Sequence, residues 1–366
     1  MRVIILTCYE SNEERVSFVY DACKSRKYNV NVITTDFSHI KKEKRNNVPK
    51  KYITINTNSY SKNLSIQRMA SHAKFAKDAF AMAEQYTPDL IWLMAPANSL
   101  IKEAKKYKKK YPMTKLIIDI IDMWPESLPI RINKKIFPFN IWKNIRKNNI
   151  NCADYLVTEC DFYQDILKNE YHGNIQTIRW SRNSTAKKNR QLVNKDTLSL
   201  CYIGSINNII DTYRIKDLIN NIDAPITLHV IGEGENRYNF INELRRVCEV
   251  IYHGPIRDEK LKAEIFNKCH AGINIYRNNL YIGLTVKCLD YFEHGLPIIN
   301  NIKGDTWNMV DKYKVGVNVT DDSKIESNTL INMRKNNKHI YDFYSENFTK
   351  EVFTKNCLHV IDEVIK

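Results

Sequence analysis

The chain has 366 residues, of which 43% are hydrophobic and 27% are charged, and its formal net charge is +15. This length exceeds one ordinary hydrophobic core, so we expect about two domains, and the composition is that of a globular protein. The nine cysteines are scattered without a CxxC pair, which argues against a disulfide framework or a zinc knuckle and favours a cytoplasmic location. No apolar stretch reaches the roughly 20 residues that span a bilayer, so any membrane contact would be peripheral.

Short apolar runs alternate with helical patterns along the first half of the chain. Helical periodicity predicts helices over residues 13–26 and 65–85. Apolar runs predict strands over residues 2–7, 29–35, 89–94, 116–121 and 155–158. Alternation of this kind predicts a parallel sheet covered by helices on both faces. We expect this N-terminal domain to cover residues 1–182.

A polar loop, DMWPES, follows the strand expected at 116–121 and begins at Asp122. It would lie at the carboxyl edge of the sheet, where open α/β sheets bind ligands. Two interpretations of Asp122 remain open: a functional acid, or a helix cap or brace for the turn at Trp124 and Pro125. Arg179 is a further candidate by its position in the chain, although such an arginine is usually only solvated.

Two basic stretches lie in the N-terminal half, at residues 102–115 and 131–147. The first is expected to be the solvated face of a helix. In the second, aromatic and aliphatic residues alternate with lysine and arginine, so core packing and a membrane-surface role are both open. No recognition helix or RNA-binding motif accompanies the charge, and nucleic-acid binding is therefore not expected.

A polar, basic segment at residues 183–197 interrupts the pattern and is the predicted linker. A second parallel-sheet domain is expected at residues 198–340. Its strands are predicted over residues 198–204, 226–232, 249–254, 271–276 and 297–301. Apolar residues recur at helical spacing over residues 341–366, which are expected to form helices that close the fold. These helices either pack on the second domain or cross back to the N-terminal domain.

The segment GLTVKCLDYFEHGLPII, residues 283–299, predicts a short helix with clear ends. Thr285 can cap its start, Gly295 suits the position just past its end, and Pro297 prevents its continuation. The helix would cover residues 286–294.

Lys287 and Asp290 are three residues apart and share one face of this helix. The amide groups and the macrodipole of a helix N-terminus favour phosphate, and Lys287 would add a positive charge beside them. Asp290 could accept hydrogen bonds from ribose hydroxyls. The alternative is an ordinary packing helix with a Lys–Asp pair on its surface.

This segment resembles the donor-binding motif of GT-B glycosyltransferases, especially family 4 and related bacterial surface-polysaccharide enzymes, whose helix reads roughly GLxxxEAMAxGxPVI. On this resemblance, Asp290 takes the place of the ribose-binding glutamate, and Lys287 stands where some relatives carry a phosphate-binding lysine. The first glutamate of the family's E-x7-E motif falls at Ile282, which cannot bind sugar hydroxyls. The resemblance therefore does not define the donor sugar.

Three other places support the resemblance. CYIGSINN is similar to the family's GGRL-type turn, with Gly204 retained and Ser205 in place of the usual arginine. LHVIGEGENR and IYHGPIRDEKL resemble a strand pair whose second member contacts the nucleobase in relatives, which implies Gly254 and Ile256. The DMWPES loop is similar to a stretch of polysaccharide sugar transferases that carries acceptor-side polar residues.

The resemblance implies an α/β fold of two Rossmann-like domains facing a cleft. The implied activity is transfer of a hexose or N-acetylhexosamine from a nucleotide donor, UDP-linked, to a growing bacterial surface glycan or other glycoconjugate, with retention. Neither a DxD pair nor a metal-ligand spacing is present in the sequence, so no metal and no cofactor are expected. The enzyme would act in the cytoplasm. It could also contact the anionic inner face of the plasma membrane peripherally.

The candidate site residues combine these motifs with positions at strand ends. They are, for catalysis, Asp122 and Lys287; for donor binding, Gly204, Ser205, Gly254, Ile256, Arg277, Thr285, Val286, Lys287 and Asp290; and on the acceptor side, Trp124, Glu126 and Arg179.

Two alternatives to a transferase remain. A nucleotide-sugar epimerase shares the architecture and could explain Ile282. A non-catalytic GT-B accessory subunit would accommodate both Ser205 and Ile282.

Overall fold

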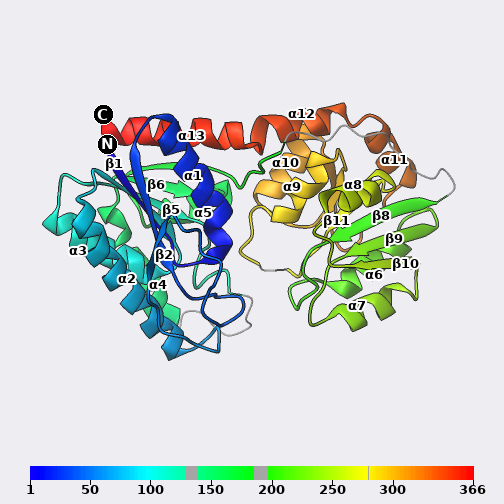
Figure 1. Cartoon of the computed structure of the whole chain (residues 1–366). Coiled ribbons are helices and arrows are strands. Elements are labelled where there is room, and N and C mark those ends of the chain that lie inside the picture. The colour runs from blue at the N-terminus through cyan, green and yellow to red at the C-terminus, as the bar shows by residue number, and fades with distance from the viewer. Residues whose placement is uncertain (129–138, 185–196, 279) are drawn as a thin grey trace. The chain divides into compact units, whose positions relative to one another are not determined.

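The computed structural model describes residues 1–128, 139–184, 197–278 and 280–366, which form two compact units (Figure 1). The first unit comprises Met1–Trp180 and Lys350–Lys366, and the second comprises Ser181–Thr349. Most of the predicted linker lies outside the described residues, as does the first part of the basic stretch at 131–147. Among the described residues, no helix is long and apolar enough to cross a bilayer.

A seven-stranded parallel sheet forms the centre of the first unit, with strand order β3-β2-β1-β4-β5-β6-β7. The strands are β1 Arg2–Leu6, β2 Asn29–Thr35, β3 Tyr52–Ile55, β4 Leu90–Ala95, β5 Lys115–Ile120, β6 Tyr155–Thr158 and β7 Asn174–Thr177. The helices are α1 Glu13–Ser25, α2 Ile66–Tyr86, α3 Asn98–Lys110, α4 Phe139–Lys147, α5 Asp161–Leu167 and α13 Lys350–Ile365.

Helices cover both faces of this sheet because successive strand side chains point to opposite sides. On β1, Ile4 and Leu6 belong to the core cluster that also contains residues of α2 and α3. Val3 and Ile5 belong to the opposite cluster, with α1 and α13. The near-continuous apolar strands of the sequence are thus explained by burial on two faces.

One ion pair is fully buried between α1 and β5. Arg15 Nε lies 2.8 Å from Asp119 Oδ2, Arg15 Nη2 donates to Oδ1 at 2.9 Å, and both side chains are 0% exposed. The indole N–H of Trp92 donates to the same carboxylate at 3.1 Å. Removing either partner of such a pair is expected to destabilise the fold strongly, because the other charge would remain buried without a counter-charge.

The second unit contains a six-stranded parallel sheet of order β10-β9-β8-β11-β12-β13. Its strands are β8 Leu198–Ile203, β9 Ile226–Ile231, β10 Glu249–Gly254, β11 Ala271–Asn274, β12 Ile298–Asn300 and β13 Gly316–Asn318. Its helices are α6 Thr212–Asn220, α7 Arg237–Leu244, α8 Glu259–Asn267, α9 Val286–Glu293, α10 Asp305–Tyr313, α11 Ser327–Lys335 and α12 Lys338–Asn347.

The predicted α/β fold of two Rossmann-like parallel sheets is confirmed. Every strand expected from an apolar run is present within a few residues of its predicted bounds. The sequence did not predict β3, β7 and β13, which are the short strands at sheet edges, where few residues need burial on both faces.

Candidate functional site

In the second unit, two glycine turns meet at the carboxyl edge of the sheet. Gly204 follows β8 and Gly232 follows β9, and a Cβ atom on Gly232 would lie only 2.0 Å from the carbonyl oxygen of Gly204. The amide of Gly232 donates to the carbonyl of Gly254 at 2.9 Å, so the ends of β8, β9 and β10 form one continuous backbone surface. Glycine is therefore needed at position 232, where the two turns touch, while the approach of a phosphate to Gly204 stays a prediction.

Helix α9 begins and ends where the sequence predicts. Thr285 is its N-cap residue, and Gly295 follows its C-cap with φ +63°. The amide of Gly295 donates to the carbonyl of Phe292, and that of Leu296 donates to the carbonyl of Tyr291. These two bonds form a Schellman motif, which fixes the end of the helix.

The side chain of Thr285 differs from expectation. Its hydroxyl donates to Asn274 Oδ1 at 2.7 Å, at the end of β11, and lies 3.1 Å from Cys288 Sγ, but it makes no capping bond to a backbone amide of the helix. Thr285 therefore joins the helix to the sheet and leaves the first-turn amides to other partners.

We expect Gly295→Ala to lower the free energy of unfolding by about 2 kcal/mol or more, through left-handed backbone strain and overpacking. A Cβ atom there would lie 2.5 Å from Asn337 Nδ2 and from Tyr341 Cζ. Gly254→Ala is the matched control, because φ is +72° but a Cβ atom would meet nothing within 4 Å. Denaturant unfolding of both variants checks this, and equal losses would contradict the steric contribution.

Lys287 carries a buried amine in the first turn of α9. The residue is 8% exposed, and its Nζ has no hydrogen-bond partner among the described residues. The amine lies 4.3 Å from the ring centroid of Tyr202 and 4.5 Å from that of Tyr276. A Cβ atom on Gly204 would lie 3.8 Å from Lys287 Cε, so the amine adjoins the glycine turns.

Burial lowers the pKa of Lys287 to about 7, since desolvation disfavours the charged amine and no carboxylate offsets it. Two aromatic faces can attract a cation but cannot accept its hydrogen bonds as an anion would. The arrangement is suited to an anionic ligand that brings oxygen atoms to this amine.

Asp290 is not paired with Lys287. Its Oδ1 accepts a hydrogen bond from Lys262 Nζ at 3.1 Å, and its Oδ2 accepts one from Arg182 Nη2 at 3.3 Å. The residue is 8% exposed. The interpretation of Lys287 and Asp290 as a surface pair is therefore wrong, while the ribose contact of Asp290 stays a prediction.

The remaining donor-side candidates also lie in the second unit. Ser205 is exposed, Val286 is 41% exposed at the first turn of α9, and Ile256 is half-buried beyond β10. Arg277 is exposed, and its backbone amide donates to the carbonyl of Ile209 at 2.9 Å. Ile282 packs against the hydrophobic core of the unit.

Sequence reasoning missed Tyr202, Tyr276 and Lys262. Each of the two tyrosines stands at or just beyond the end of a strand, a position that signals the ligand edge of a parallel sheet. Lys262 sits on α8 and reaches Asp290 only through the fold.

The acceptor-side candidates lie in the first unit. Trp124 Nε1 donates to Asp122 Oδ2 at 2.7 Å, which is the loop-bracing contact foreseen as one alternative. Burial raises the pKa of Asp122. Glu159, which sequence reasoning missed, follows the neighbouring strand β6, and burial together with Asp122 raises its pKa to about 8.

Glu126 and Arg179 are both engaged in ion pairs. Both oxygens of Glu126 accept hydrogen bonds from the buried Arg146, which also binds Glu170. Arg179 Nη2 donates to Asp161 at 2.5 Å. Binding of an acceptor by these two residues stays a prediction.

No group of three or more His, Cys, Asp and Glu side chains that could hold a metal ion is found among the described residues. No protein-family model and no curated protein matches the chain.

Solved structures share the fold. Sucrose-phosphate synthase from Thermosynechococcus elongatus is 11% identical, with a TM-score of 0.73 over 100% of this chain and 99% of that one. The apo form of the lipopolysaccharide outer core galactosyltransferase WaaB is 16% identical, with a TM-score of 0.68 over 99% of each chain. Anabaena HepE in complex with UDP is 11% identical, with a TM-score of 0.65 over 99% of this chain and 100% of that one. At these identities the likeness establishes the GT-B fold.

Proposed function

We propose that the chain is a glycosyltransferase that moves a hexose or N-acetylhexosamine from a nucleotide donor, most simply UDP-linked, to a glycan or other glycoconjugate. The observation that carries this proposal is the buried, unpartnered amine of Lys287 beside the start of α9 and the turn at Gly204. A diphosphate would give the amine its missing partners. HepE, which shares the fold, was solved in complex with UDP, and this supports a nucleotide donor.

The proposed chemistry needs charge stabilisation on the donor side. The bond between the anomeric carbon and the β-phosphate oxygen breaks, and the acceptor oxygen bonds to that carbon on the same face. Lys287 and the first amides of α9 stabilise the negative charge on the departing diphosphate, a role that a metal ion plays in other transferases. In the first unit, we assign Asp122 to the acceptor hydroxyl, whose proton it would take up.

The acceptor is proposed to be a growing bacterial surface glycan, assembled at the inner face of the plasma membrane. Peripheral contact with anionic lipid would rest on the basic stretch at residues 131–147, of which α4 is the described part. The exposed lysines of α3 would add to it.

A panel of UDP-, GDP- and dTDP-sugars tests the proposal by thermal unfolding. A donor present at 100 times its Kd should stabilise the protein by about 2.7 kcal/mol, which raises the Tm. Absence of any shift at millimolar concentrations of every donor would refute nucleotide-sugar binding. The anomeric configuration of the product, read by NMR, distinguishes retention from inversion.

One observation favours a second candidate, a non-catalytic GT-B accessory subunit. Ile282 replaces the acid expected to bind the donor sugar and packs against the core. UDP release that depends on an added acceptor separates the transferase from this subunit and from an epimerase, which needs no acceptor.

We expect the affinity for UDP to fall as the pH rises above about 7. Bound diphosphate favours the charged amine, so it raises the pKa of Lys287 from its value of about 7. Below that pH the amine is already protonated; above it, binding must take up a proton, and the Kd should increase by up to about tenfold per pH unit. Titration calorimetry in buffers of different ionisation enthalpy measures this proton, and a Lys287→Met variant should show a flat profile.

A further inference from the structure

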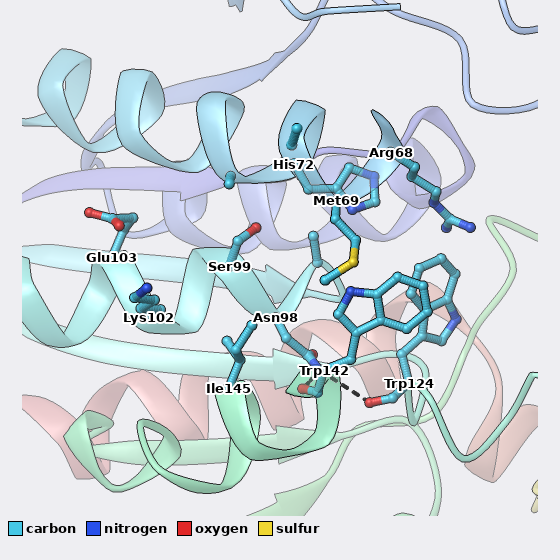
Figure 2. Close-up of a pocket in the computed structure, with 13 residues that line it drawn as sticks. Arg68, Met69, His72, Asn98, Ser99, Lys102, Glu103, Trp124, Trp142 and Ile145 are labelled. Carbon is cyan, nitrogen blue, oxygen red and sulfur yellow. Dashed lines mark hydrogen bonds between the residues drawn. The ribbon is translucent and has the colours of Figure 1, made fainter. Parts of the chain in front are cut away.

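The first unit holds a cavity of about 300 Å³ between the first turns of α2 and α3, the loop after β5, and α4. Figure 2 shows the indole rings of Trp124 and Trp142 at one end of it and Lys102 and Glu103 at the other. The two rings are 6.3 Å apart between centroids and tilted by 34°. Trp124 belongs to the DMWPES loop and Trp142 to the basic aromatic stretch at residues 131–147, but the sequence does not show that the two meet at a cavity.

Its walls are mainly apolar, formed by the indoles together with Met69, Ile145 and small alanine side chains. Arg68 and His72 also line the cavity, and the guanidinium carbon of Arg68 lies 3.7 Å from the ring centroid of Trp124. An occupant would therefore meet carbon and sulfur surface over most of its length, which favours a hydrocarbon chain.

The polar groups of the walls are largely occupied. Asn98 Nδ2 donates to the carbonyls of Trp124 and Trp142, at 3.1 and 2.8 Å, and Glu103 accepts from Lys106 at 2.8 Å. Ser99 Oγ is buried with no partner in the described part of the chain. Arg68 Nε is likewise buried without a partner in that part of the chain, so the wall offers a few polar atoms beside its apolar surface.

The end of the cavity opposite the indoles carries the charged side chains of Lys102 and Glu103, and Glu103 is paired with Lys106. Lys102 lines the cavity, is exposed, and forms no ion pair with any described residue. Further along α3, Lys105, Lys106, Lys109 and Lys110 are exposed as well. This charge complements an anionic head group at the mouth of an apolar cavity.

We propose that the cavity binds one anionic single-chain lipid, with its hydrocarbon chain between α2 and the two indoles and its phosphate at Lys102. The site goes beyond the proposed transfer reaction, since it needs no nucleotide.

A series of alkyl phosphates with four to twelve carbons, each below its critical micelle concentration, tests the proposal on the whole chain. Affinity measured by tryptophan fluorescence should rise by about two- to fourfold per methylene and then level off once the cavity is full. A steady rise with no plateau would indicate adsorption to the surface and would overturn the proposal, as would an absence of binding.

Substitutions at exposed positions locate the site without disturbing the core. Ala73→Phe fills the cavity from α2 and should weaken binding of decyl phosphate at least tenfold, whereas Ala81→Phe, on the same helix outside the cavity, should not. Lys102→Gln should weaken binding of decyl phosphate but not of decanol. Equal affinities for the two phenylalanine variants would refute the site, even if both still adsorb to anionic vesicles. UDP affinity, measured in parallel, reports separately on the proposed transferase.

Discussion

Replacing Lys287 by methionine is expected to lower turnover of the nucleotide-sugar donor by about 10²-fold or more while raising the melting temperature. The loss of turnover follows because a preorganised charge at the departing diphosphate typically contributes 10² to 10³ in rate. The gain in stability follows because the amine is buried without a hydrogen-bond partner and carries an uncompensated desolvation cost. Methionine is unbranched and only one atom shorter than lysine, so it fills most of the space between Tyr202 and Tyr276 while removing the amine with its charge and its N–H donors.

The two readouts separate a functional from a structural lysine. Lys335→Met, at the exposed end of α11, is the control and should change neither turnover nor melting temperature. A lower melting temperature for Lys287→Met would show that the amine stabilises the fold. Near-normal turnover would remove Lys287 from the proposed mechanism.

The start and end of α9 could be predicted because they depend on residues that are close in the sequence. A threonine with extended backbone at the N-cap position, a glycine in the left-handed region and a following proline act within a few positions, so the sequence alone predicts the bounds of the helix. The environment of its side chains depends on distant segments. Asp290 is paired with Lys262 and Arg182, which are 28 and 108 positions away, and no local pattern reveals either partner.

The tyrosines beside Lys287 illustrate a second reason why the sequence did not reveal the whole site. An aromatic residue in or after an apolar run predicts core packing equally well, and both Tyr202 and Tyr276 are indeed buried. Their role at the amine becomes visible only when β8, β11 and α9 are brought together. The cavity between α2, α3 and α4 was unpredictable for the same reason, since its walls come from four segments that are separate in the chain.

Asp119→Ala is expected to lower the free energy of unfolding by about 3–5 kcal/mol, because it leaves the Arg15 guanidinium buried without its carboxylate. The indole N–H of Trp92 would lose its acceptor in the same step. Loss on this scale is a large part of the total stability of a domain, so partial unfolding of the first unit is expected at moderate temperature. Denaturant unfolding followed by circular dichroism measures the effect.

The matched control is Asp78→Ala, which breaks the exposed pair between Asp78 and Lys74 on α2 and should cost no more than about 0.5 kcal/mol. A double variant, Arg15→Met with Asp119→Leu, tests the cause of the loss. It removes both charges and replaces them with apolar side chains, so it should recover most of the stability that Asp119→Ala loses. If the double variant is as unstable as the single one, the loss is due to packing around β5 and not to an uncompensated buried charge.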